Sequence, residues 1–186
     1  MFPAIADVAD PIPFTIRPTS IDDVPHLARI ERSAGQIFRC IPELSWLAGQ
    51  EPLPPARHLA CIRNGISFVA VNQLNEPVAF LAATIHDGDL HIEELSTDAT
   101  AQNKGCARAL IHATEQAAIH HGLKALTLTT FKAVPWNGPF YSRLGFVALQ
   151  PGDKHPRLMA LLSAEEQHGF PPGTRCAMRK AILKTD

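Results

Sequence analysis

The sequence predicts one layered α/β (α+β) domain, built on a mixed sheet with helices on both faces. Its 186 residues suffice for a single domain with a sizeable core. A hydrophobic content of 46% and a charged content of 19% are ordinary for a globular protein. Apolar residues change repeatedly between the period of a strand and that of a helix, in the order β-α-(α)-β-β-β-α-β-α-β-α-β.

The N-terminal elements follow from local signals. Residues 1–13 contain three prolines and are expected to form an irregular arm. The stretch FTIRPTS is a short strand that ends at Pro18. In SIDDVPHLARIERSAG, Ser20 suits the N-cap position and Gly35 the C-terminal end, which predicts a helix.

The next stretch has weaker helix signals and clear strand signals. PELSWLAG is expected to be a short helix, and QEPLPPAR a proline-rich loop. ISFVAVN is a strand and LNEP a turn. PVAFLAATIHDGDLHIEELSTD then gives two strands that the DGD turn joins as a hairpin.

The C-terminal part alternates helices and strands. A helix is expected over 105–121, followed by the strand KALTLTTF and a second helix at about 136–144. After the strand GFVALQ, residues 152–172 are expected to be a helical insertion, and TRCAMRKAIL is the last strand. The whole domain is expected to span 14–183.

Composition argues against several classes of function. The net charge of −1 gives no basic field for nucleic acid, and no apolar run could span a bilayer. The N-terminus lacks the basic start of a signal peptide, and the histidines show no metal-ligand spacing. We therefore expect a cytoplasmic protein with no nucleic-acid, membrane or metal partner. Its cysteines are widely spaced and are expected to be reduced thiols: Cys40, Cys61, Cys106 and Cys176.

The loop QNKGCA stands at the start of the helix 105–121. The first turn of a helix has N–H groups without intrahelical partners and a partial positive charge, so it suits an anion such as phosphate. Gly105 lets the backbone approach a ligand, while Lys104 and Arg108 add positive charge. The alternative is a glycine turn that merely connects a strand to a helix.

Three motifs together carry a family resemblance. QNKGCA matches the pattern Gln/Arg-x-x-Gly-x-Gly/Ala, HIEELSTDATAQ is similar to a fourth strand, and VPWNGPFYSRLGF holds an Asn and a Tyr before LGF. On these motifs the chain resembles the GNAT superfamily of acyl-CoA N-acyltransferases, from roughly Phe14 to Leu183. It departs from the pattern at Thr97, where Val or Ile is more usual, and at Cys106, a variable position.

The resemblance implies a mostly antiparallel central sheet that is splayed between its fourth and fifth strands. It also implies that acetyl-CoA is the cosubstrate. The diphosphate would lie on the loop before the helix, and the pantetheine arm would pair with the backbone of Leu95 and Thr97. The expected coenzyme-binding residues are Leu95, Ser96, Thr97, Gln102, Asn103, Lys104, Gly105, Cys106, Ala107, Arg108, Asn137 and Tyr141.

Acetyl transfer to an amine needs a base, and the nearest candidates are Glu93 and Glu94. Consecutive strand residues point to opposite faces unless a bulge intervenes, so one of the two should face the thioester. Glu93 is the preferred base because the resemblance places a catalytic Glu there. Glu94 and His91, which shares the face of Glu93 by parity, are the reserves. An exposed acid paired with a Lys or Arg is the alternative.

Asn137 and Tyr141 are four residues apart, hence on one helical face. The resemblance implies that Tyr141 donates its hydroxyl proton to the departing thiolate and that Asn137 binds the pantetheine arm. Asn137 could instead be a helix N-cap, and Tyr141 an ordinary half-buried aromatic residue. Cys106 is not expected to be a nucleophile, because no partner motif accompanies it.

The expected function is N-acetyl transfer from acetyl-CoA to a primary amine of a small molecule, by direct attack in a ternary complex. The acidic pair favours a cationic acceptor such as a polyamine. Phe38, Glu43 and Trp46 could line the acceptor pocket, beside the insertion 152–172. The alternatives are a non-catalytic acyl-CoA sensor, an enzyme acting on a protein N-terminus or lysine, and a module whose loop binds nothing. The chain could also form a homodimer.

Overall fold

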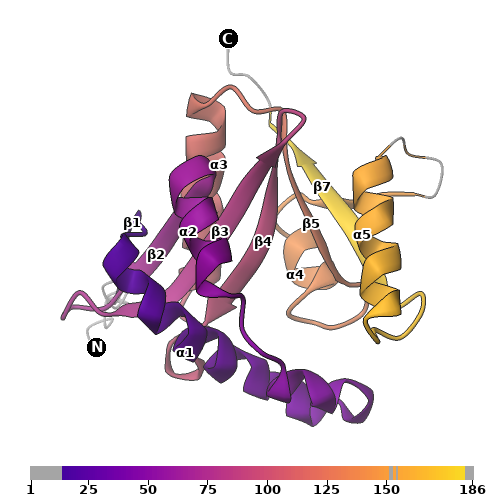
Figure 1. Ribbon diagram of the computed structural model, residues 1–186, viewed down its shortest axis with the longest axis horizontal. Coiled ribbons are helices and arrows are strands. Elements are labelled where there is room, and N and C mark those ends of the chain that lie inside the picture. Colours follow the sequence, from indigo (N-terminus) through magenta and orange to yellow (C-terminus); the bar gives the residue numbers. More distant parts are fainter. Residues whose placement is uncertain (1–13, 151–152, 154, 183–186) are drawn as a thin grey trace, which may run out of the picture.

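The computed structural model describes residues 14–150, 153 and 155–182, so the predicted arm 1–13 lies outside the described residues. A seven-stranded sheet in the order β1-β2-β3-β4-β5-β7-β6 forms its centre (Figure 1). Neighbouring strands are antiparallel except β4 and β5, which run parallel. The predicted mixed, mostly antiparallel sheet is thus confirmed.

The elements have the following bounds. The strands are β1 Thr15–Pro18, β2 Ile66–Val71, β3 Pro77–His86, β4 Asp89–Thr97, β5 Ala125–Phe131, β6 Val147–Ala148 and β7 Arg175–Ala181. The α-helices are α1 Val24–Gly35, α2 Pro55–Asn64, α3 Cys106–His120, α4 Gly138–Ser142 and α5 Pro156–Gln167. The short 3-10 turns are η1 Ile21–Asp23, η2 Gln36–Cys40, η3 Pro42–Gly49 and η4 Ala99–Ala101.

Both faces of the sheet are covered, as predicted. One face packs against α3 through buried residues such as Leu81, Leu110 and Leu126. The other face packs against α1 and α2 through Leu27 and Phe80, among others. Helix α5 lies on this second face, where Glu165 accepts a hydrogen bond from Thr129 of β5 (Figure 1). The sheet is therefore the middle layer of three.

Helix α2 corrects the sequence interpretation. Residues 50–57 are predicted as a proline-rich loop, but a helix begins at Pro55 and buries His58 and Cys61. Proline is tolerated in the first turn of a helix because the N–H that it lacks would have no intrahelical partner there. The helix predicted at 136–144 is shorter than expected, and the strand after it is reduced to β6.

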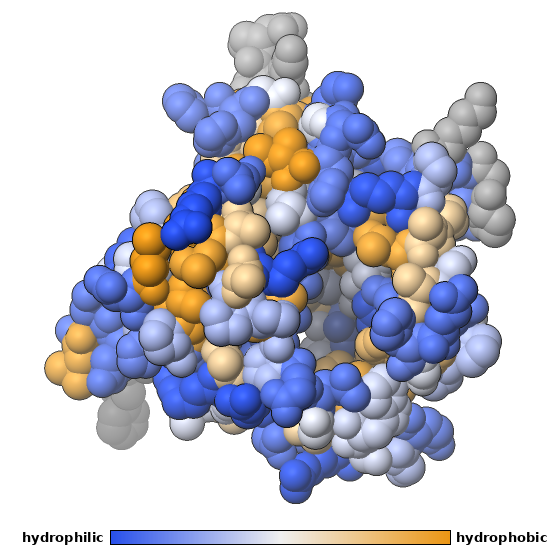
Figure 2. Space-filling model, in the orientation of Figure 1, coloured by the Kyte–Doolittle hydropathy of each residue, from blue (hydrophilic) through white to orange (hydrophobic). Residues whose placement is uncertain are grey.

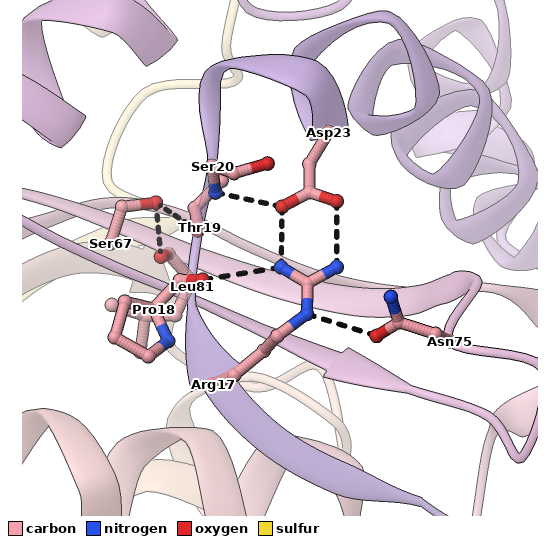
Figure 3. Close-up of polar contacts among 8 residues, drawn as sticks. All are labelled: Arg17, Pro18, Thr19, Ser20, Asp23, Ser67, Asn75 and Leu81. Atoms are coloured by element: carbon pink, nitrogen blue, oxygen red, sulfur yellow. Dashed lines mark hydrogen bonds and ion pairs between the residues drawn. The ribbon is translucent and has the colours of Figure 1, made fainter.

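Polar contacts hold the first strand in place (Figure 3). The guanidinium of Arg17 makes two hydrogen bonds with the carboxylate of Asp23, at 2.7 and 2.9 Å, and donates a third to Asn75. Burial would raise the pKa of Asp23, but the hydrogen bonds from Arg17 and Ser20 outweigh it and lower the pKa. The edge strand β1 is thereby tied to η1 and to the β2–β3 turn.

The parallel strands β4 and β5 separate soon after they meet. Only two residue pairs join them, Leu90 with Leu126 and His91 with Thr127. Beyond these pairs the two strands diverge (Figure 1). The facing backbone edges of both strands therefore lose their ladder partner across the gap, which is the splay expected between the fourth and fifth strands.

Candidate active site

A cavity of about 900 Å³ occupies the opening between β4 and β5. In Figure 2 the surface is hollowed between the part that carries α1 and α2 and the part that carries α5. Residues of β4 from His91 to Thr97 line one side of the cavity, and β5 residues from Leu128 to Phe131 line the other. The cavity continues to the N-terminus of α3, so it joins the candidate anion site to the acidic residues of β4.

The loop before α3 presents free backbone donors. Gly105 has φ +86° and a Cβ added there would meet nothing within 4 Å, so the loop is open on that side. Among the described residues, the N–H groups from Gly105 to Arg108 have no hydrogen-bonded backbone partner. Asn103, with φ 61°, precedes them in the left-handed region. This arrangement suits the phosphates of a ligand.

Not every side chain of this loop that the sequence predicts as coenzyme-binding lies in the cavity. Gln102, Asn103, Gly105, Cys106, Ala107 and Arg108 all line the cavity. Lys104 does not belong to that lining, because its ammonium donates to the carbonyl of Thr100 at 2.8 Å. The thiol of Cys106 is buried, which raises its pKa and keeps it protonated.

A β-bulge determines where the two glutamates of β4 point. Opposite β4, Ala82 pairs with Glu94 and Ala83 pairs with Ile92, so Glu93 is the extra residue. Glu94 and Glu93 consequently share the face of α1 and α2. Simple alternation, which would separate them, fails at this point. His91 also lies on this face, opposite Thr84.

Glu93 is engaged by neighbouring side chains. Its carboxylate accepts hydrogen bonds from Arg57 at 2.6 Å and from Thr84 at 2.5 Å. Burial would raise the pKa of Glu93, but these two bonds and the charge of Arg57 lower it. The ionised, paired state of Glu93 matches the alternative reading of an acid bound to an arginine, although the Glu93 carboxylate is largely buried.

Glu94 has a different environment. It lines the cavity, and burial raises its pKa against the opposing effects of a hydrogen bond from Ser96 at 2.8 Å and the charge of Arg175. A carboxylate of raised pKa in a cavity suits the acceptance of a proton near neutral pH. Because the Ser96 hydroxyl donates its hydrogen bond to Glu94, the side chain of Ser96 holds the Glu94 carboxylate in position.

His91 lies where β4 and β5 part. Its Nδ1 is 3.0 Å from the hydroxyl of Thr127. Burial, aided by the charge of Arg157, lowers the pKa of His91 to about 4. The imidazole is therefore neutral near neutral pH and is a weak base.

Tyr141 and Asn137 meet at the start of α4. Tyr141 is 9% exposed, lines the cavity, and has no hydrogen bond to its hydroxyl among the described residues. Asn137 occupies the N-cap position but makes no side-chain cap bond, and its buried Oδ1 has no partner in the described chain. The backbone at Gly138 packs closely against the chain at Lys132. A Cβ at position 138 would lie 2.5 Å from the carbonyl oxygen of Lys132, so glycine is required there.

Aromatic residues close one end of the cavity. Phe38 lines it and lies 5.8 Å from Phe131 and 5.7 Å from Trp136, measured between ring centroids. Phe170, which follows α5, belongs to the same lining. Trp46 instead packs against Phe170 from outside the lining, and Glu43 does not reach the cavity. This end of the cavity therefore has an apolar wall.

An ion pair stands beside this wall. Arg175 binds Glu165 at 2.6 Å, and its guanidinium lies over the rings of Phe131 and Phe170. Both side chains belong to the second face of the sheet and line the cavity. The sequence does not identify Arg175 or Glu165 as site residues, because they form a pair only when α5 packs against β7.

Glu31 of α1 is a further cavity residue that sequence reasoning missed. Both of its carboxylate oxygens lie 3.0 Å from the backbone nitrogen of Leu53. Burial and the nearby charge of Glu94 raise the pKa of Glu31 to about 8. One signal could have found it: Glu31 is one turn after Leu27, on the apolar stripe of the helix.

Two further features are absent from the described residues. Within residues 14–150, 153 and 155–182, no group of three or more His, Cys, Asp or Glu side chains could hold a metal ion. In the same part of the chain, no helix has the length and hydropathy of a membrane span.

A splayed sheet, free backbone donors at the start of α3 and a cavity that connects them are the features expected of an acyltransferase that binds a coenzyme. A family model described as Acetyltransferase (GNAT) family matches residues 33–146. The chain therefore belongs to the GNAT acetyltransferase family, as the motifs predict, and acetyl-CoA is its acyl donor.

Solved structures of the same fold share little sequence with this chain. The Ard1 protein from Thermoplasma volcanium has a TM-score of 0.65 at 16% identity, covering 92% of this chain and 99% of that one. The PaiA N-acetyltransferase from Thermoplasma acidophilum, solved with coenzyme A, has a TM-score of 0.66 at 15% identity, covering 90% and 98%. The ribosomal-protein-S18-alanine N-acetyltransferase from Escherichia coli scores 0.65 at 15% identity, covering 93% and 96%.

Proposed function

We propose that the protein transfers the acetyl group of acetyl-CoA to the primary amine of a small cationic molecule, by direct attack in a ternary complex. One observation carries the proposal. A single cavity joins the free N–H groups of α3, the unpartnered Tyr141 hydroxyl and the half-buried Glu94. These are the three functions that acetyl transfer to an amine requires: an anion site, an acid and a base.

The coenzyme fits one half of the cavity. The N–H groups from Gly105 to Arg108 would hold the diphosphate, with Gln102 and Asn103 beside them. The open edge of β4 at Leu95 and Thr97 would pair with the pantetheine arm as an added strand would. The unpartnered Oδ1 of Asn137 would accept a hydrogen bond from the same arm.

The reaction then needs two proton movements. Acetyl-CoA supplies an activated thioester. We assign to Glu94, rather than Glu93, the removal of a proton from the ammonium group, which frees the nitrogen lone pair for attack. As the new C–N bond forms and the C–S bond breaks, Tyr141 donates its hydroxyl proton toward the thiolate sulfur. A second proton from the attacking nitrogen then returns to the Tyr141 oxygen. The products are the N-acetylated amine, coenzyme A and the proton that Glu94 removed.

The Gly105→Asp variant is expected to weaken acetyl-CoA binding roughly tenfold or more, because a carboxylate would face the bound phosphates. Isothermal titration with acetyl-CoA measures this. Gly122→Asp is the matched control, since Gly122 also has positive φ and open space, at the other end of α3. Equal affinity for acetyl-CoA in both folded variants would contradict the anion site.

A further inference from the structure

We propose that Glu31 is the second carboxylate of the acceptor site, where it and Glu94 bind the ammonium group of the substrate. The substrate class is a primary amine that carries an apolar body and no carboxylate beside its nitrogen. The inference rests on the proposed function, because it names the acceptor of the same reaction.

Position is the first support. Glu31 comes from α1 and Glu94 from the bulge of β4, and both line the cavity on the acceptor face. The only hydrogen bonds of Glu31 among the described residues come from the Leu53 N–H, which fixes the carboxylate while leaving lone pairs free. The adjacent Arg32 is exposed and lies 3.6 Å from Glu51, at the surface.

Charge is the second support. Glu31 and Glu94 are close enough that the charge of Glu94 raises the pKa of Glu31. The groups around the pair are Arg32 on α1, Tyr141 on α4 and Arg175 on β7. Arg175 is bound to Glu165 by two hydrogen bonds, at 2.6 and 3.1 Å. A ligand cation between the two carboxylates would relieve their repulsion.

An unpartnered polar group in the same cavity points independently to a ligand. Tyr141 is more than nine-tenths buried, and its hydroxyl has no hydrogen-bond partner in the described part of the chain. Burial followed by the charge of Glu94 raises the pKa of Tyr141, so the hydroxyl keeps its proton and can donate it. A reacting group placed between Tyr141 and Glu94 would therefore lie beside Glu31.

The remaining walls define the body of the substrate. Phe38, Leu47, Trp136 and Phe170 line the cavity at its closed end. These side chains favour an aromatic or aliphatic group attached to the amine. An α-amino acid would place its own carboxylate against Glu31 and Glu94, and Arg175, whose charge acts on Glu94, is already paired with Glu165. Repulsion should exclude it.

Phenethylamine and phenylalanine test whether a carboxylate beside the amine prevents binding, because the two molecules differ by one carboxylate. We measure binding of each to the protein saturated with coenzyme A, by titration calorimetry, and turnover with acetyl-CoA. Phenethylamine should bind and phenylalanine should bind roughly tenfold or more weakly. Glu31→Gln should weaken phenethylamine binding roughly tenfold or more, while acetyl-CoA affinity stays unchanged. The glutamine oxygen can still accept from Leu53, so folding should be kept.

Glu51→Gln is the matched control, since it removes one charge from an exposed glutamate outside the cavity. A further readout is the pH profile of kcat/KM: ionisation of Glu31, whose pKa is about 8, should produce a step near that pH in the wild type, and Glu31→Gln should lack this step. Phenethylamine that fails to bind the wild type, or binds Glu31→Gln as tightly, overturns the inference. Binding that depends on Glu31 without any turnover supports the inference and counts against the proposed function alone.

Discussion

The Glu94→Gln variant is expected to lose ~10²–10⁴-fold in kcat/KM, the usual cost of removing a proton-transfer group. The amide of glutamine keeps the size of the side chain but cannot accept the proton of the acceptor ammonium. Acetyl-CoA binding should remain near that of wild type, because the phosphates lie at the loop before α3. Amine-dependent release of coenzyme A, with titration calorimetry of acetyl-CoA, measures both quantities.

The pH dependence and the neighbouring glutamate sharpen this test. Burial raises the pKa of Glu94, so wild-type kcat/KM should rise with pH through a limb that lies above the ordinary range of a glutamate. Glu94→Gln should lose that limb. Glu93→Gln should keep most of the activity, since Glu93 is bound to Arg57 and Thr84. An inactive Glu93→Gln beside an active Glu94→Gln would restore Glu93, the base that the family resemblance implies.

The Tyr141→Phe variant is expected to fold normally, bind acetyl-CoA as wild type does, and lose ~10²–10⁴-fold in kcat with a parallel fall in kcat/KM. The hydroxyl has no protein partner among the described residues, so its removal orphans no buried group there. Its interaction arises only as charge develops on the sulfur, which makes it a transition-state effect. Steady-state kinetics and thermal unfolding of the variant measure these quantities.

Thioesters of different leaving-group acidity test the role of that hydroxyl. A more acidic thiol needs less help to depart, so the loss caused by Tyr141→Phe should be smaller with it. An equal loss with both thioesters, when chemistry limits the rate, would mean that the hydroxyl does not assist the leaving group. A stability loss of about 1–3 kcal/mol with normal turnover would instead identify a structural tyrosine.

Local signals made much of the fold predictable. Gly105 before an apolar helical repeat, and the Asp-Gly turn at 87–88, depend only on nearby residues, and the structure has both elements there. Helix α2 is not predictable in this way, because its helix signal is weak and the prolines at its start favour a loop. Its stability comes from packing against the sheet, which the sequence of 55–64 does not reveal.

The site was less predictable, for a physical reason. The orientation of Glu94 depends on a bulge, and a bulge is a mismatch in register between two strands rather than a property of one. The environment of Glu31 likewise depends on Leu53 and Glu94, which are distant in sequence. The anion loop, by contrast, is contiguous, so a motif could identify it.

Amine-dependent release of coenzyme A by the wild-type protein tests the central claim most directly. Phenethylamine, spermidine, phenylalanine and a short peptide with a free N-terminus are each offered with acetyl-CoA, and the products are identified by mass spectrometry. We predict that coenzyme A release exceeds the hydrolysis of acetyl-CoA seen without amine. We also predict that phenethylamine, a small amine with an apolar body and no carboxylate, gains one acetyl group. Acetyl-CoA that binds but acetylates none of these amines would contradict the account and identify a sensor. Acetylation of the peptide alone would replace the small molecule with a protein N-terminus.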